Sequence, residues 1–285
     1  MLNILTRQNS PQLIRLLKAS GQAYARAKLL ENTISVFMFL MGFIYPVIYL
    51  FVHNDSIKNM AFGVSLGISI FSELVMAIYK SNTEKGAIIR EQFDVTLFKL
   101  PWKSTIHKVS ESEISALAVK FDHDVSNWYS SSISGQIPDH QMVAICQMLN
   151  AAWDISLRKK YRRVLLVGIT LYTLVLITLT VVIKADMLTF FLMAFSLSSI
   201  YKHYITILRG NNGVIKKRGK LLKQIERLVM SNTYPTETEL RDFQDEIFHT
   251  RQETAKVPDW FARFTKKNCS KEMDDLIAKV NTVYS

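Results

Sequence analysis

The 285-residue chain is poor in the residues that build catalytic loops and cross-links, with ten glycines, six prolines and two cysteines. Cys146 and Cys269 lie far apart in polar segments, and neither has metal-ligand spacing around it, so we expect two free thiols in a reducing compartment. The sequence has no Gly-rich phosphate loop, no His-Glu-x-x-His and no Cys-x-x-Cys, and its six histidines are scattered. We therefore expect no enzyme, no catalytic residue, no cofactor and no metal ion.

Charge is nearly absent from four stretches of about 20 residues, which are 34–52, 60–79, 164–183 and 187–208. An α-helix of about 20 residues crosses roughly 30 Å of hydrocarbon. Lipid offers no partner for unpaired backbone groups, and the stretches lack the alternation of membrane β-strands, so they must be helical. The predicted fold is all-α: an integral membrane protein with four transmembrane helices in two hairpins and a helical cytoplasmic domain between them.

No apolar core precedes residue 34, which argues against a cleavable signal peptide and predicts that the first span is retained as an anchor. Of the 35 Lys and Arg residues, five precede the first span, 12 lie in 80–163 and 15 lie in 209–285. The positive-inside rule then places the N-terminus, the central segment and the C-terminus in the cytoplasm. The basic runs that flank the spans fit either contact with anionic lipid or binding of an anionic ligand.

These boundaries predict five segments: an amphipathic N-terminal helix (1–33), hairpin 1 (34–79), a cytoplasmic helical domain (80–163), hairpin 2 (164–208) and a cytoplasmic helical tail (209–285). The second span should continue as a helix to Pro101, and a helix starting near Pro138 should run into the third span. Capping-box patterns at Ser110 and Thr236 predict helix starts. We expect the first of these helices to reach about residue 125, and the tail to hold further helices at about 214–230, 259–265 and 271–282.

Two opposite charges interrupt the spans. Glu73 and Lys202 each lie six residues before the cytoplasmic end of a span, which puts both roughly 9 Å inside the same boundary. They can pair as a structural lock or a pore gate, or Lys202 can reach the headgroups while Glu73 bonds to a neighbouring helix. Pro46, in the middle of the first span, is a candidate hinge.

Several short motifs resemble a signature of the SMODS-associated four-transmembrane effector family, and the resemblance covers roughly residues 1–210. The motifs are Glu91-Gln92-Phe93-Asp94, Leu97-Phe98-Lys99-Leu100-Pro101-Trp102, Asn127-Trp128-Tyr129 and the pattern that runs from Cys146 to Tyr161. The resemblance implies a pore-forming effector of bacterial cyclic-oligonucleotide antiphage signalling (CBASS) in the inner membrane. A partner nucleotidyltransferase would make the cyclic oligonucleotide, and the effector would bind it and disrupt the membrane.

The cytoplasmic residues suit such a ligand. Aromatic faces stack on nucleobases, and basic side chains neutralise phosphates. The candidate ligand-binding residues are Arg90, Trp102, Lys103, Trp128, Tyr129 and Arg158. The aromatics can equally fill the core of a small helical domain, and Asp154 lies four residues before Arg158 as a helical ion-pair partner.

The expected partners are the lipid bilayer, the cyclic oligonucleotide and further copies of the chain, because four helices are few for a wide pore. We expect no nucleic-acid polymer as a partner. Two other functions remain open, a membrane anchor or scaffold with a cytoplasmic interaction domain, and a small channel or transporter unrelated to defence.

Overall fold

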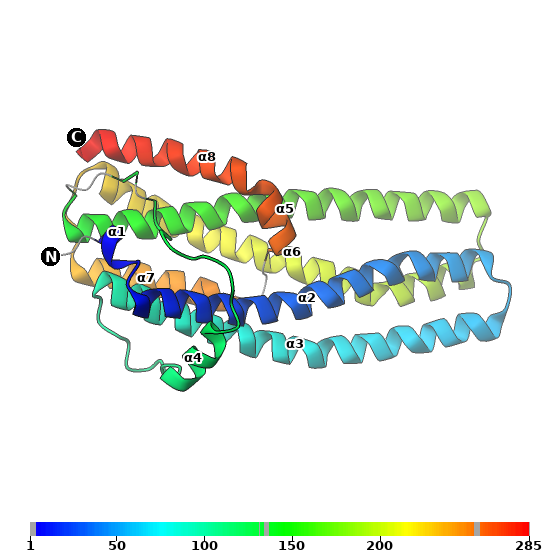
Figure 1. Ribbon diagram of the computed structural model, residues 1–285. Helices are drawn as coiled ribbons and strands as arrows, with labels where there is room; N and C mark the ends of the chain where they lie inside the picture. Colours follow the sequence, from blue (N-terminus) through cyan, green and yellow to red (C-terminus); the bar gives the residue numbers. More distant parts are fainter. Residues whose placement is uncertain (1–3, 131, 134–136, 254–256, 285) are drawn as a thin grey trace.

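Four long helices form the body of the molecule and are joined in pairs as two hairpins (Figure 1). They are α2 (Pro11–Phe51), α3 (Asp55–Phe98), α5 (Asp139–Ile183) and α6 (Met187–Met230). This computed structural model describes residues 4–130, 132–133, 137–253 and 257–284. Both hairpin turns lie at one end of the bundle, whereas α1 (Ile4–Arg7), α7 (Glu237–Gln252) and the end of α8 (Asp259–Tyr284) lie at the other (Figure 1).

The two turns are short because each following helix begins on a strong cap. The side chain of Asn54 accepts hydrogen bonds from the backbone N–H groups of Ser56 and Ile57. Asp186 accepts one from the backbone of Thr189 at 2.9 Å. Such side chains satisfy N–H groups that the first turn of a helix leaves unpaired. The caps therefore let α3 and α6 start directly after the turn.

The apolar half of the molecule, defined as residues 34–79 and 164–208, turns large hydrophobic side chains outward. Phe71 is 64% exposed, Val182 is 71% exposed and Phe191 is 59% exposed. An apolar surface of this kind is typical of helices that contact lipid. Among the described helices, α2, α3 and α5 are long and apolar enough to cross a membrane, whereas α6, whose apolar run includes Lys202 and His203, falls short of that criterion.

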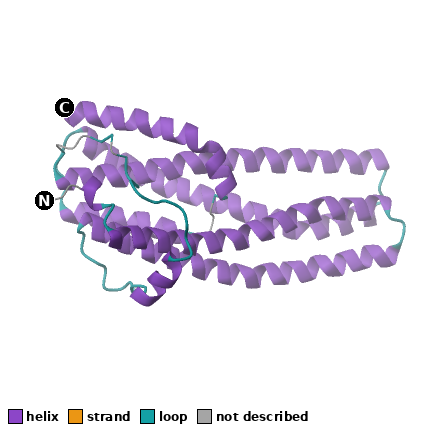
Figure 2. Cartoon of the chain, in the orientation of Figure 1, coloured by secondary structure: helices purple, strands orange, loops and turns teal. Residues whose placement is uncertain are grey.

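The polar half comprises the remaining described residues and contains a large hydrophobic core, with a smaller separate cluster of Tyr161, Val257 and Phe261 around Ile207. The continuations of the four long helices are covered there by α1, α7, α8 and the short α4 (Glu111–Ala118). Phe93, Met142, Ile145 and Ile225 are fully buried in this core. Helices joined by loops make up the described chain, without a strand (Figure 2). The predicted all-α class is thus confirmed.

Two local predictions were wrong, and a third helix is present as part of a longer one. The helix that starts after Ser110 ends at Ala118 rather than near residue 125, and the ring of Phe121 then packs against Gly21 of α2. The tail has one helix over 259–284 in place of two short ones, because no Pro or Gly interrupts that range. The basic helix predicted over 214–230 is present and ends at Met230, as the last part of α6.

Candidate functional site

Glu73 of α3 and Lys202 of α6 form an ion pair in the apolar half, with 2.7 Å between Lys202 Nζ and Glu73 Oε1. Their side chains are 64% and 72% exposed, so the pair lies on the outer surface of the four-helix bundle. Each charge satisfies the other, which lowers the cost of placing either of them at hydrocarbon depth. Of the two arrangements that the sequence left open, the structure shows the one in which Glu73 and Lys202 pair.

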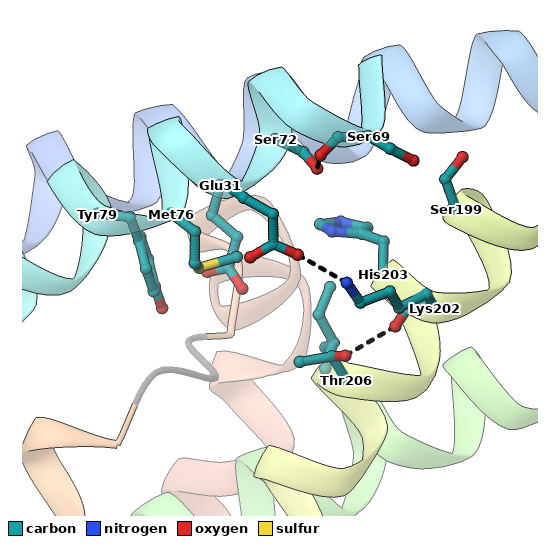
Figure 3. A pocket seen from close by; sticks show the side chains of 11 residues that line it. Glu31, Ser69, Ser72, Met76, Tyr79, Ser199, Lys202, His203 and Thr206 are labelled. Atoms are coloured by element: carbon teal, nitrogen blue, oxygen red, sulfur yellow. Dashed lines mark hydrogen bonds and ion pairs between the residues drawn. The ribbon is translucent and has the colours of Figure 1, made fainter. Parts of the chain in front are cut away.

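A cleft of about 340 Å³ surrounds this ion pair and is walled by α2, α3 and α6 (Figure 3). Thr206 Oγ1 donates a hydrogen bond to the Lys202 carbonyl, and His203 Nε2 lies 2.9 Å from Ser35 Oγ. The other lining residues are Glu31, Ser69, Ser72, Met76, Tyr79, Ser199 and Ile207. Hydroxyl, imidazole and charged groups on adjoining helices can coordinate water or an ion, which an apolar helix surface cannot do.

Pro46 lies inside α2 and has no N–H to donate to the carbonyl of Gly42, one helical turn earlier. The hydroxyl of Tyr172 on α5 donates a hydrogen bond to that Gly42 carbonyl. A group freed by proline in a membrane helix is commonly satisfied by a neighbouring helix. The candidate hinge is therefore held by a contact between the two hairpins.

Two of the predicted ligand residues are engaged within the polar half. Trp102 Nε1 donates to the carbonyl of Ile106 at 2.8 Å, and its ring faces Lys108, whose Nζ is 5.1 Å from the ring centroid. Lys103 Nζ is 3.2 Å from Asp245 Oδ2 of α7. Trp102 packs at the margin of the core, and Lys103 joins the loop after α3 to α7.

The neighbouring residues Trp128 and Tyr129 face different surroundings. Trp128 is 44% exposed, and its ring centroid is 4.0 Å from the guanidinium carbon of Arg90. Tyr129 is buried against Phe98, and its backbone N–H and carbonyl both bond to the side chain of Gln8. The structure therefore brings Arg90 and Trp128 together and places Tyr129 in the core.

Arg158 is buried and bound on two sides. Its Nε donates to Asp154 Oδ2 at 2.7 Å, which is the helical ion pair anticipated as an alternative, and its Nη1 donates to Asn211 Oδ1 of α6 at 2.9 Å. Arg218 Nε lies 3.4 Å from the same Asp154 oxygen. Arg158 thus belongs to a buried polar network that links α5 and α6.

Sequence reasoning missed two further buried arginines, Arg218, which shares Asp154 with Arg158, and Arg251, which pairs with Asp94. Arg218 lies in the apolar stripe of α6, and Arg251 ends the apolar stripe of α7. Burial, together with the nearby charges of Arg251 and Arg158, lowers the pKa of Arg218 to about 10, although Asp154 acts in the opposite direction. Burial also opposes the charge of Arg251, but Asp94, Tyr24, Tyr129 and Glu91 together outweigh it and raise the pKa of Arg251. In both helices, the sequence signal for a buried arginine was a charged residue at a position where the helical spacing predicts an apolar one.

A family model described as "SMODS-associating 4TM effector domain" matches residues 2–280. The chain belongs to this effector family. It is 25% identical over 275 residues to a probable CBASS effector molecule of Bacillus cereus (strain VD146), covering 90% of this chain and 91% of that protein. No solved structure matches. The resemblance drawn from the short motifs is confirmed, and so is a helical membrane protein.

Membership of this 4TM family is relevant to whether α6 is the fourth membrane-spanning helix. The family description counts four spans, and α6 lies beside the three helices that meet the criterion for spanning (Figure 1). The Glu73–Lys202 pair joins α3 to α6, and the same two helices supply Asp94 and Arg218 to the buried ion pairs of the polar half, where Asp154 of α5 and Arg251 of α7 are their partners. Within the described residues, no group of three or more His, Cys, Asp or Glu side chains is placed to hold a metal ion.

Proposed function

We propose that the chain is a membrane effector of bacterial antiphage defence that opens or disrupts the inner membrane. The trigger is a cyclic oligonucleotide made by a partner nucleotidyltransferase and bound by the polar half. Membership of the SMODS-associating 4TM family and similarity to a probable CBASS effector molecule support this role. The termini then lie in the cytoplasm, where the basic segments and the nucleotide are found together.

The observation that carries the proposal is the continuity of the long helices. α2, α3, α5 and α6 each run without a break from the polar half into the apolar half. A helix of 44 residues such as α3 spans about 66 Å at a rise of 1.5 Å per residue. A displacement in the polar half therefore reaches the membrane through rigid elements, provided that the ligand binds the open arrangement better than the closed one.

The Glu73–Lys202 pair supports the same proposal at the other end of these helices. It joins α3 to α6, so it links the two hairpins near the inner boundary of the membrane. Because both side chains are exposed, charged groups lie on a surface that would otherwise contact lipid. Contact of this surface with a further copy of the chain would remove these groups from lipid, which is favourable. We propose that a homo-oligomer forms the conducting path and that this pair holds the closed state.

The test is dye release from liposomes that contain the purified full-length protein, with and without a panel of cyclic di- and trinucleotides. We expect release with one class of nucleotide and little release without it. Bilayers without protein and the corresponding linear nucleotides are the controls. Release that is independent of every nucleotide would favour a channel or transporter, and no release together with binding of a protein partner would favour a scaffold.

A further inference from the structure

We propose that Arg90, Arg218 and Arg251, called here the arginine cluster, bind the phosphate groups of an anionic phosphodiester in the centre of the polar half. The inference deepens the proposed function and rests on it, because that function requires a cyclic oligonucleotide to bind in this half. Arg90 was a candidate from the sequence, whereas Arg218 and Arg251 become candidates only from the fold.

The cluster is assembled from three helices around one point. Arg90 comes from α3, Arg218 from α6 and Arg251 from α7, and they are 8%, 4% and 8% exposed. The fourth wall is Tyr24 of α2. Arg218 Nε donates to Thr250 Oγ1 at 2.9 Å, next to Arg251 in the chain, and Arg251 pairs with Asp94, one helical turn after Arg90. The charges of all three arginines also lower the pKa of Tyr24, which burial raises. Three buried guanidinium forks on neighbouring helices supply the kind of donors that phosphate oxygens accept.

The counter-ions of the cluster are too few for its charge. Arg251 forms an ion pair with Asp94. Arg218 Nε lies 3.4 Å from Asp154 Oδ2, but this same oxygen accepts the closer bond, of 2.7 Å, from Arg158. Asp154 is thus shared between two buried guanidinium groups, and Glu91, whose charge also acts on Arg251, is paired with Arg241. Positive charge that is buried in excess of its counter-ions is costly, and an anion in the same space relieves that cost.

Arg90 is the least satisfied member of the cluster. Its Nη1 atom is buried and has no hydrogen-bond partner among the described residues. Burial lowers the pKa of Arg90 to about 10, so it remains charged at neutral pH. The ring of Trp128 covers this guanidinium from outside and is 44% exposed. Trp128 is thus the part of the wall nearest solvent, and its ring can stack on a nucleobase once the ligand displaces it.

Ligand entry at this point has a mechanical consequence. Asp94 Oδ2 accepts bonds from Arg251 and, at 3.1 Å, from Gln244, and these bonds tie α7 to α3. A phosphate that accepts the bonds of Arg251 competes with Asp94 and loosens that connection. Because α3 continues to Glu73, release of α3 from α7 reaches the ion pair in the apolar half.

The test measures equilibrium binding to the full-length protein in detergent micelles. The labelled probes are cyclic di-AMP, cyclic di-GMP, cyclic GMP–AMP and cyclic tri-AMP. Arg90→Met and Arg218→Gln are compared with Arg227→Gln, which changes an exposed arginine on the same helix as Arg218. We expect the Kd of the bound probe to rise about tenfold or more in both cluster variants and to stay within about twofold in Arg227→Gln.

Thermal unfolding without ligand separates binding from structure. Arg90→Met should unfold at the wild-type temperature or above it, because it removes a buried charge that no hydrogen bond holds at Nη1. Loss of binding together with a lower unfolding temperature in both cluster variants would mark the cluster as structural and overturn the inference.

The liposome assay keeps the two proposals apart. Nucleotide-dependent leakage with unchanged affinity in both cluster variants overturns the arginine site and leaves the effector function standing. Cluster-dependent binding without leakage overturns the function and leaves the site standing. A wild-type protein that binds none of the four probes overturns both.

Discussion

The two halves of the molecule place their charges in opposite positions, and each position is unfavourable for its surroundings. In the apolar half, Glu73 and Lys202 are more than 60% exposed on the surface that meets lipid. In the polar half, Arg90 and Arg218 are less than 10% exposed. A protein selected for stability alone would place these charges the other way round. Both halves therefore contain charged groups that could change partners when a ligand binds or when the membrane path opens.

The halves also differ in what one broken pair costs. The exposed pair in the apolar half can be rescued by water at the membrane boundary or by a neighbouring chain. The buried pairs in the polar half cannot be compensated in this way, because removing one partner leaves the other charge unpaired in a low-dielectric interior. The largest effects on stability are therefore expected in the polar half.

Arg251→Met should produce the largest loss of stability, about 3–5 kcal/mol in the free energy of unfolding. It leaves the Asp94 carboxylate buried without its ion-pair partner. The double variant Arg251→Met with Asp94→Leu should recover most of this loss, because both charges are then removed. Denaturant unfolding in detergent measures both values. A single variant that loses less than about 1 kcal/mol would show that Asp94 is not compensated by Arg251.

Glu73→Gln tests the apolar half and should cost up to about 3 kcal/mol at hydrocarbon depth, because Lys202 loses its counter-charge. We expect dye leakage from liposomes to rise without any nucleotide. The exchange Glu73→Lys with Lys202→Glu should partly restore the seal. Ser72→Ala is the matched control, since Ser72 lines the same cleft and its hydroxyl donates to the Ser69 carbonyl of its own helix. Wild-type behaviour of Glu73→Gln would remove the pair from the mechanism.

Gly86→Ala should destabilise the polar half by about 1–3 kcal/mol through overpacking. A Cβ at this position would lie 2.9 Å from Cδ1 of Tyr24, whose ring forms a wall of the arginine cluster. Gly219→Ala is the control, because a Cβ there meets nothing within 4 Å, and the change should add up to about 1 kcal/mol of helix propensity. Thermal unfolding of both variants measures the difference. Equal stability of the two variants would contradict the close packing of α2 on α3.

Local signals predicted the framework of the fold. The capping box at Thr236 is present, with the Thr236 N–H bonded to Glu239 Oε2 at 2.9 Å, and α5 runs unbroken into the third span as its apolar stripe indicated. The arginine cluster depends instead on pairs such as Arg251 with Asp94, which are 157 residues apart. A single sequence shows the polar residue in an apolar stripe but not the helix that faces it, so Arg218 and Arg251 were missed.

The smallest expected effect tests the contact between hairpins at Pro46. Tyr172→Phe removes the hydroxyl that bonds to the Gly42 carbonyl and should cost about 0.6–1.7 kcal/mol, the range of hydrogen bonds between membrane helices. Pro46→Ala supplies a backbone N–H that can satisfy the same carbonyl. In the Pro46→Ala background, Tyr172→Phe should therefore cost almost nothing, and thermal unfolding of the four proteins in detergent gives the coupling. Additive losses would show that Tyr172 stabilises the bundle independently of Pro46, and the hinge would then lose its connection to hairpin 2.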